Sequence, residues 1–298
     1  RNIQNILKQH STSDRDVVTA IDYDTQGRVH KQYEPFASVN SNGAFVSTIP
    51  SAVPYSENLY EASPLNRTIS ITPPEWYATT MEYGSNAASE VFDYAENAFY
   101  AADELMKMTV TDPEGNQTIT FKDKRGRLIC STQQKGLDET TTYYVYDDKD
   151  RLELVLPPTD GGSPQDSTDL HFVYLYDGAD NLIEKKILRA TAITMQYSDR
   201  DLLTAIQDGN MAAINRWLVT QHDSYGRATK TGFDSNVGIP DPDFPIIDTL
   251  LTETFYDGGF GVTASMDKQY YGRVRKSETR ILGTGDFLES VFTYDKHG

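Results

Sequence analysis

The sequence predicts an all-β fold of stacked, spiralling antiparallel β-hairpins with long ordered loops. Two observations lead to this prediction. A short phrase, Tyr-Asp-x-x-Gly-Arg, recurs along the 298 residues, and an internal repeat of this kind is typical of an architecture built from stacked units. The segments beside the phrase alternate apolar and polar residues with a period of two, which is the pattern of half-buried strands.

The phrase is complete once and recurs in looser copies. The complete copy is Tyr23-Asp24-Thr25-Gln26-Gly27-Arg28. In other copies Asp occupies the Gly position, or Lys or His precedes the first Asp. These copies are Lys122-Asp123…Gly126-Arg127, Tyr146-Asp147…Asp150-Arg151, Tyr176-Asp177…Asp180-Asn181, His222-Asp223…Gly226-Arg227, Tyr256-Asp257 and Tyr294-Asp295…Gly298.

Each residue of the phrase suits a tight turn. Asp is favoured at the first position of a type I turn, where its carboxylate accepts a hydrogen bond from a nearby backbone N–H. Asp24 and Gly27 have the spacing of the first and fourth positions. Gly in the left-handed region then forms the bulge that joins the turn to a twisted hairpin. Asp150 and Asp180 fit the same position, since Asp tolerates that region better than most side chains.

The flanks of the turns are predicted to be strands that stack on their neighbours. Phe172, Tyr174 and Tyr176 share one face before a turn, and Leu152 and Leu154 alternate with charged or branched residues after one. The phrase recurs after 30 residues from Tyr146 to Tyr176, and then at shorter intervals. Two strands and two turns fill such an interval. One hairpin cannot bury its own face, so it must pack against the next.

The chain is predicted to contain two regions that form one continuous structural unit. Residues 1–105 comprise an N-terminal hairpin and an irregular segment rich in Pro, Ser, Asn and Tyr. That composition favours long ordered loops over regular strands in residues 35–105. A short helix is expected around 96–108, where Ala and Leu cluster. Residues 106–298 form the dense repeat region.

Composition excludes some classes of partner. The net charge is −17, which argues against binding to nucleic acid or to an anionic membrane, because both attract clustered Lys and Arg. No apolar run is long enough to cross a membrane. The single cysteine, Cys130, cannot form an internal disulfide and is expected to be a buried, inert thiol. The ends interrupt the phrase, so we expect a fragment of a longer polypeptide whose signal lies outside it.

The ordered series of phrases resembles the bacterial Rhs/YD-repeat family, and specifically the N-terminal repeat region of a large member. The resemblance covers nearly the whole chain. The residues that carry it, besides the copies above, are Tyr33-Glu34-Pro35-Phe36, Tyr60-Glu61-Ala62-Ser63-Pro64-Leu65-Asn66-Arg67, Thr142-Tyr143-Tyr144-Val145-Tyr146 and Leu282-Gly283-Thr284-Gly285-Asp286-Phe287-Leu288.

The resemblance implies hairpins that spiral into a hollow shell. In full-length members the shell often encloses a variable C-terminal effector, frequently a toxin, and the protein is exported or displayed at the cell surface. This chain lacks the segment that ends such shells, where self-cleaving members carry catalytic aspartates, and it lacks an effector. Proteolysis and toxicity therefore do not carry over. The implied partners are other segments of the same polypeptide, and no cofactor is implied.

Little in the sequence indicates catalysis. There is no phosphate-binding glycine loop, HExxH, CxxC or Gly-x-Ser-x-Gly motif, and His222 occupies a Tyr position, which favours a structural role. The acidic turns at 147–150 and 177–181 offer oxygens for Ca²⁺ without the EF-hand spacing. Two of their carboxylates could form a glycosidase pair only across a cleft. Turn carboxylates along an edge do not meet that condition, so we predict no enzyme.

Two function hypotheses remain. The first is a non-enzymatic segment of a shell or surface scaffold. The second is a glycan- or protein-binding module that uses aromatic side chains of the irregular segment, because exposed aromatic rings stack on sugars and anchor interfaces. The alternative for these side chains is that they pack the loops. The candidate ligand-binding residues are Trp76, Tyr77, Tyr55 and Tyr60.

Overall fold

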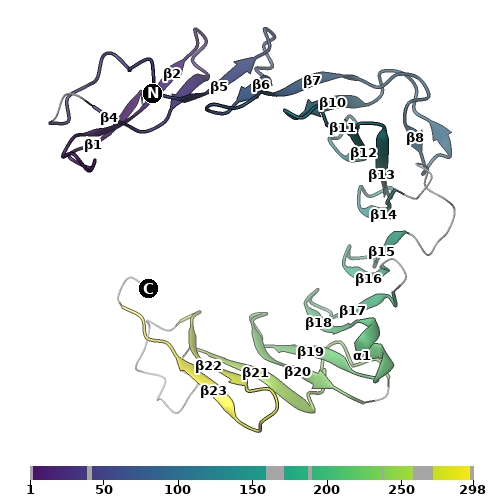
Figure 1. Ribbon diagram of the computed structural model, residues 1–298. Helices are drawn as coiled ribbons and strands as arrows, with labels where there is room; N and C mark the ends of the chain where they lie inside the picture. Colours follow the sequence, from purple (N-terminus) through teal and green to yellow (C-terminus); the bar gives the residue numbers. More distant parts are fainter. Residues whose placement is uncertain are drawn as a thin grey trace. The chain divides into compact units, whose positions relative to one another are not determined.

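The structure is a computed structural model that describes residues 3–38, 42–158, 171–186, 190–236, 238–257 and 271–295. Almost all regular structure in these ranges is antiparallel β-strand, which confirms the predicted fold class (Figure 1). The chain divides into two compact units. One consists of residues 1–145 with 157–165, and the other of residues 146–156 with 166–298.

In the first unit the strands pair with neighbours in near-sequential order. β2 pairs with β1, β3 and β4; β3 pairs with β5; and β5, β6, β7, β10, β11, β12 and β13 follow one another. The strands are β1 (Gln4–Leu7), β2 (Val17–Tyr23), β3 (Val29–Tyr33), β4 (Phe36–Ala37), β5 (Tyr55–Tyr60), β6 (Thr68–Thr72), β7 (Thr79–Ser85), β8 (Phe92–Asp93), β9 (Ala98–Phe99), β10 (Met106–Thr111), β11 (Gln117–Lys122), β12 (Leu128–Lys135) and β13 (Asp138–Tyr146).

In the second unit each strand from β14 to β23 pairs with the next along the chain. The elements are β14 (Leu152–Leu156), β15 (Phe172–Tyr176), β16 (Leu182–Lys186), β17 (Ile193–Tyr197), β18 (Leu203–Gln207), α1 (Gly209–Ala213), β19 (Trp217–His222), β20 (Ala228–Asp234), β21 (Thr249–Tyr256), β22 (Val274–Arg280) and β23 (Phe287–Val291). The described ranges hold no helix long and apolar enough to cross a membrane.

The predicted bulge occurs where the phrase places it. The strand register shifts between Asp22 and Tyr23, immediately before the turn that begins at Asp24. It shifts in the same way at Tyr60, Lys122, Tyr176, Tyr197, His222 and Tyr256. The fourth turn position has a positive φ whether it is Gly27 (82°) or Asp180 (71°). The prediction that Asp replaces Gly there is therefore confirmed.

Two local predictions for residues 35–105 are wrong. The segment was expected to lack regular strands, yet β5, β6 and β7 are full members of the sheet, because Pro and Ser fall in the connections while the strand residues alternate. Residues 96–108 do not form a helix: they hold β9, a run of turns and the start of β10. Asn86 explains the turns, because its buried amide binds Leu105 N and Ala101 O and so fixes a compact excursion.

Each unit has its own small group of buried apolar side chains. In the second unit Ala205, Trp217 and Val219 are buried together, and Ile247 packs against them. In the first unit the excursion that carries β8 and β9 covers part of the sheet. There the ring of Tyr94 lies 4.9 Å from both Phe92 and Tyr143, which attaches the excursion to β13.

Candidate functional site

The aspartates of the repeated phrase bind the backbone of their own turns, as predicted. In the complete copy, Asp24 Oδ1 accepts hydrogen bonds from Gln26 N and Arg28 N, both at 2.9 Å. Asp24 Oδ2 accepts from Arg28 Nε at 2.6 Å. Asp123, Asp147 and Asp223 repeat all three contacts with their own i+2 and i+4 residues. In Asp177 the Asn181 amide replaces the Arg.

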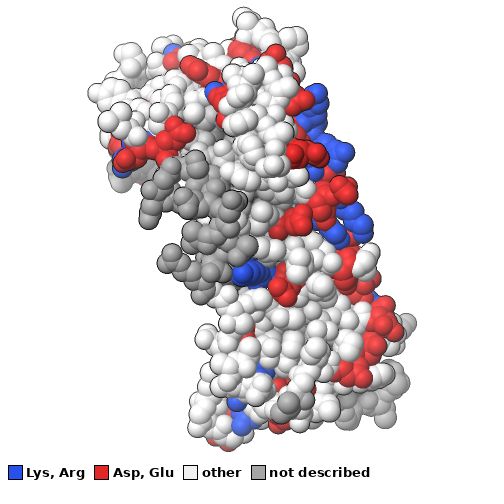
Figure 2. Space-filling model, turned by 90° about the vertical axis from the view of Figure 1, so that its right-hand side faces the viewer, with Lys and Arg blue, Asp and Glu red and all other residues white. Residues whose placement is uncertain are grey.

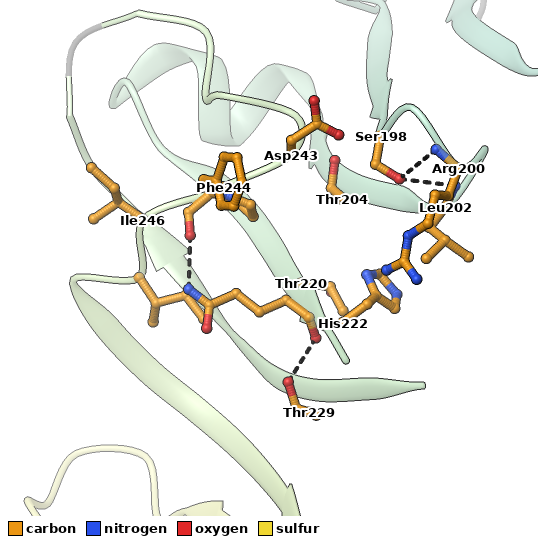
Figure 3. A pocket seen from close by; sticks show the side chains of 13 residues that line it. Ser198, Arg200, Leu202, Thr204, Thr220, His222, Thr229, Asp243, Phe244 and Ile246 are labelled. Carbon is orange, nitrogen blue, oxygen red and sulfur yellow. Dashed lines mark hydrogen bonds between the residues drawn. The ribbon is translucent and has the colours of Figure 1, made fainter. Parts of the chain in front are cut away.

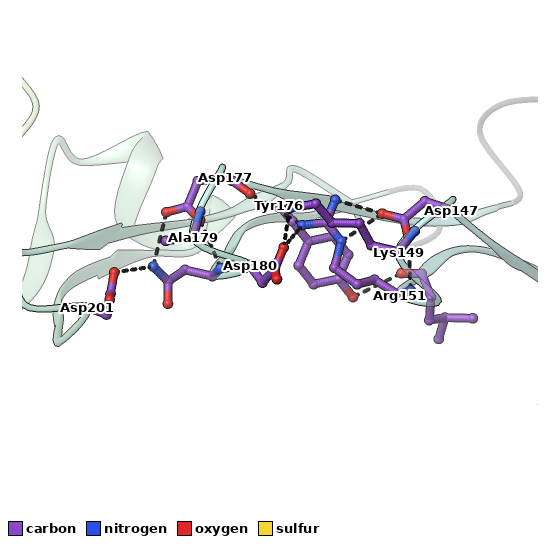
Figure 4. Close-up of polar contacts among 10 residues, drawn as sticks. Asp147, Lys149, Arg151, Tyr176, Asp177, Ala179, Asp180 and Asp201 are labelled. Carbon is purple, nitrogen blue, oxygen red and sulfur yellow. Dashed lines mark hydrogen bonds and ion pairs between the residues drawn. The ribbon is translucent and has the colours of Figure 1, made fainter.

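The Arg at the end of the phrase also contacts the next turn. The Arg151 guanidinium lies 4.7 Å from the centre of the Tyr176 ring, and the Tyr176 hydroxyl donates to Leu152 O at 3.0 Å (Figure 4). We call this pair of contacts the Arg–Tyr junction. The Arg stacks on the Tyr that precedes the next turn, and that Tyr bonds the carbonyl one residue beyond the Arg. A cation over an aromatic face is attracted by the ring quadrupole.

The Arg–Tyr junction recurs in both units. Its Arg-to-ring distances are 4.4 Å for Arg28–Tyr60, 4.3 Å for Arg67–Tyr83 and 5.1 Å for Arg273–Tyr294. Their hydroxyls donate to Val29 O, Thr68 O and Val274 O at 2.9, 2.9 and 2.7 Å. Arg227 stacks on Tyr256 at 4.3 Å. The phrase is therefore both a turn and a device that joins consecutive turns, a second role that the sequence alone did not reveal.

Ion pairs reinforce the junctions. Arg151 Nη1 donates to Asp180 Oδ1 at 2.5 Å, and Lys149 Nζ donates to the same oxygen at 2.8 Å (Figure 4). On the face drawn in Figure 2, Lys and Arg lie beside Asp and Glu and form no broad basic patch. The acidic composition is thus partly offset where the turns meet.

The turn carboxylates are held in their ionised form. Partial burial raises the pKa of Asp147, but hydrogen bonds from the Arg151 backbone and side chain outweigh it, so the pKa lies below its usual value. Hydrogen bonds from the Arg67 and Ser63 side chains lower the pKa of Glu61, which takes the Asp position in its turn, to about 2. A general acid needs the opposite shift. These groups therefore have the electrostatics of structural turn residues.

The acidic turns offer no formed cation site. Asp180 Oδ1 is occupied by Lys149 and Arg151, and within the described ranges no group of three or more His, Cys, Asp or Glu could hold a metal ion. The thiol of Cys130 is buried, and burial raises its pKa to about 12, as expected of an unreactive cysteine.

The predicted aromatic residues separate into two groups. Tyr60 belongs to an Arg–Tyr junction, so it is a structural residue. Trp76 and Tyr77 are 66% and 75% exposed, and their rings meet edge to face at 6.5 Å. Trp76 and Tyr55 line a hollow of about 320 Å³ together with Glu57, Pro73 and Glu75. Of the four predicted residues, two therefore line the hollow, Tyr77 contacts one of these two, and Tyr60 lies elsewhere.

A larger hollow of about 650 Å³ lies in the second unit and was not predicted (Figure 3). It is bordered by the turn at 198–202, by His222 and by the segment 243–247. Two departures from the phrase signalled it. Leu202 occupies the Arg position of its turn, and His222 occupies the Tyr position of the next. His222 in the Tyr position predicts a structural histidine, but the sequence alone does not show that both partners of a junction are missing there.

The chain was compared with known proteins. A family model described as a domain of unknown function, DUF6443, matches residues 1–86. The crystal structure of TcdB2-TccC3-TEV matches with a TM-score of 0.56 and 13% identity over 95% of this chain. The Photorhabdus luminescens Tc holotoxin pore, with a TccC3 mutant, matches with a TM-score of 0.55 and 13% identity over 100% of this chain. The fold matches the β-rich Tc toxin shell.

This likeness shows the fold alone, because the identity is low. The chain spans 14% of the TcdB2-TccC3-TEV chain and 15% of the holotoxin chain that it matches. A third similar structure, TcdB2-TccC3 without its hypervariable C-terminal region, has a TM-score of 0.56, is 12% identical, and covers 96% of this chain and 14% of that one. Comparison with curated proteins returns no match.

Proposed function

We propose that the chain is a non-enzymatic wall segment of a large exported or surface-displayed bacterial protein of the Rhs/YD-repeat type. The Arg–Tyr junctions carry this proposal. They join each hairpin to the next through side chains that recur in the sequence. The polar side chains of the phrase are engaged in these structural contacts and are not available for catalysis. Arg273 and Tyr294 still form such a junction at the end of the described chain. As a wall segment, the chain would have neighbouring repeats of the same polypeptide as its partners.

We propose that this wall is part of a closed shell. The fold likeness to TcdB2-TccC3 supports it, as does the match of residues 1–86 to a family model of unknown function. One of the similar structures is described as lacking a hypervariable C-terminal region. By analogy we propose that the wall encloses a further part of its own polypeptide, a C-terminal effector. The two predicted regions, 1–105 and 106–298, would then act as one continuous piece of wall, consistent with the pairing of β7 with β10.

The open edge at β23 makes the proposal testable on the chain itself. Within the described residues β23 pairs only with β22, and all five of its residues are exposed, including Leu288 and Val291. An exposed apolar edge strand is a template for another strand. In the proposed wall this edge receives the next repeat.

We therefore expect the isolated chain to self-associate as its concentration rises, and Leu288→Lys to reduce this association because a charge on the edge opposes strand pairing. Sedimentation velocity measures both effects. Leu137→Lys, at the exposed tip between β12 and β13, is the matched control and should associate like the parent. A strictly monomeric parent at all concentrations, or equal association of all three proteins, would count against a wall edge at β23.

A second candidate function, glycan binding, is favoured by the exposure of Trp76 and Tyr77 beside the hollow that Tyr55 lines. The adjacent Trp76 and Tyr77 rings could stack on a sugar ring. The Glu75 carboxylate could accept hydrogen bonds from the hydroxyls of the sugar, as could Glu57, whose Oε1 also pairs with His30 and Lys31. A protein ligand would use the same aromatic anchors.

This candidate predicts saturable binding to at least one glycan on an oligosaccharide array. Trp76→Ala should weaken that binding by about thirtyfold or more, since loss of a hot-spot aromatic anchor costs about 2 kcal/mol or more. Tyr225→Ala, which removes a ring of another turn that is 81% exposed, should leave the binding unchanged. Absence of binding, or binding that survives Trp76→Ala, rejects the candidate without affecting the wall proposal.

A further inference from the structure

One junction in the second unit has lost the Asp, the Arg and the Tyr of the phrase. The turn at 198–202 has Ser198 in the Asp position and Leu202 in the Arg position. The following turn is preceded by His222 instead of Tyr. Leu202 lies over Gly226, whose Cβ, if present, would be 3.6 Å from both Leu202 Cδ atoms. The chain therefore has an apolar contact where the turns that end in Arg have a cation over a phenol ring.

The guanidinium of Arg200 joins this turn to the next, although Arg200 does not stand at the Arg position of the phrase. Its Nη1 donates to Ser224 O at 3.0 Å and its Nη2 to Asp223 O at 2.9 Å. The two turns are thus still joined, but from two residues earlier in the first turn. The position that a phenol ring fills elsewhere contains only the smaller imidazole of His222, which has no hydroxyl to reach the carbonyl beyond Leu202. The hollow of about 650 Å³ opens at this junction (Figure 3).

A separate segment of the chain walls the hollow. Asp243 Oδ1 accepts from Asp199 N at 2.9 Å, and Gln221 Nε2 donates to Pro245 O at 2.8 Å, so the segment is tied to both sides of the junction. Between these ties Phe244 is 80% exposed and Ile246 61% exposed, and both line the hollow. Ligand pockets commonly have this size, with apolar walls and a few oriented polar groups.

The hollow is lined by one cationic side chain, Arg200, and one anionic side chain, Asp243, so its charges offset each other. Both Arg200 Nη atoms already donate to carbonyls, so Arg200 has limited capacity for an anion. Burial, with the nearby Arg200 guanidinium, lowers the pKa of His222, and a cationic ligand would meet the same guanidinium. Neither an anionic nor a cationic ligand is favoured, so the hollow is suited to a neutral ligand.

The remaining polar groups mostly accept hydrogen bonds. The hydroxyls of Thr204 and Thr229 donate to Gln196 O and Gln221 O, which leaves their oxygens as acceptors. Gln221 donates through Nε2 to Pro245 O, which leaves Oε1. A neutral ligand should therefore bring a hydrogen-bond donor as well as an apolar ring to pack against Leu202 and Phe244.

We propose that this hollow binds a neutral phenol, such as the side chain of a tyrosine in a peptide or a free phenolic compound. The ring lies beside the His222 imidazole, in the room that this smaller side chain leaves at the junction, and its hydroxyl donates to the acceptors of β18–β20. The site is independent of the wall role, because it exists where the wall-building phrase is absent.

Calorimetric titration with p-cresol, the side-chain analogue of tyrosine, tests the site. We expect binding in the millimolar range. Roughly tenfold weaker binding is expected for 4-methylanisole, which has the same ring but no donor, since one hydrogen bond contributes about that factor. N-acetyltyrosinamide separates the two sources of phenol: tighter binding than p-cresol indicates a peptide, and weaker binding indicates a free phenol. No p-cresol binding, or equal binding of both ring compounds, overturns the proposal.

Variants place the binding at the junction. His222→Tyr fills the ring position from within and should reduce p-cresol affinity at least tenfold, and Phe244→Ala should weaken it severalfold by removing the apolar wall. Ile239→Ala, an exposed residue of the same connection outside the hollow, should bind like the parent. Melting curves establish that each variant is folded, and if His222→Tyr is not, Phe244→Ala carries the test. Unchanged affinity in the folded variants overturns the proposal.

Discussion

Gly232→Ala is expected to destabilise the second unit by about 3 kcal/mol, the upper range for overpacking a well-packed site. Gly232 lies in β20 between Val219 of β19 and Leu250 of β21. A Cβ at this position would press on Thr249 O and Ile247 Cγ2 and would lie 3.1 Å from Leu250 Cα. Two of these atoms belong to the backbone of a paired strand, so the strand itself must move to relieve the contact.

Chemical denaturation followed by Trp217 fluorescence measures the effect, because Trp217 is buried in the cluster beside Gly232. Gly178→Ala is the matched control: no heavy atom lies within 4 Å of its added Cβ and its φ is not positive. That variant should be as stable as the parent or slightly more so, since alanine reduces the entropy of the unfolded chain. Equal stability of the two variants would contradict the close approach of β20 and β21.

The hairpin units were predictable because their chemistry is local. An Asp that caps its own turn and a residue with positive φ three positions later act within five residues of sequence. Asp24, Asp147 and Asp177 therefore behave as their neighbours dictate. The alternation that marks the strands is equally local, so the all-β class and the order of hairpins followed from sequence.

Other features were not predictable because a distant residue decides them. Glu61 performs the Asp role in a longer turn only because Arg67 and Ser63 bind its carboxylate, so the strands on either side were read as loops. The stretch 96–108 has residues typical of a helix, but the buried Asn86 binds its backbone and holds it in turns. Long-range side-chain contacts overrode local preference in both places.

The candidate sites show the same division. Trp76, Tyr77 and Tyr55 were identified by residue type. Trp76 and Tyr55 line one hollow, and the Tyr77 ring lies edge to face against Trp76. Tyr60 has the same residue type but serves a junction, which only its contacts with Arg28 and Val29 reveal. The hollow beside His222 could not be predicted without knowing the Arg–Tyr junction, because it lies where that junction is missing.

Tyr176→Leu is the second large effect, with an expected loss of about 2 kcal/mol. The substitution removes the hydrogen bond to Leu152 O, worth about 1 kcal/mol, and the ring beneath the Arg151 guanidinium, worth about 1 kcal/mol at a partly exposed site. Both contacts join the turn that begins at Asp147 to the turn that begins at Asp177. Tyr225→Leu removes a ring that is 81% exposed and whose centre lies 5.1 Å from the Arg227 guanidinium, so the expected loss is smaller, about 0.5 kcal/mol.

The central claim is that the repeated phrase couples each turn to the next, and a double-mutant cycle between Arg151→Met and Tyr176→Leu tests it most directly. The free energy of unfolding of the double variant should fall by clearly less than the sum of the single losses, outside the 0.3–0.5 kcal/mol within which independent sites add. The cycle of Arg151→Met with Tyr225→Leu should be additive. Additivity in the Arg151–Tyr176 cycle as well would contradict the claim that the Arg–Tyr junction holds the repeats together.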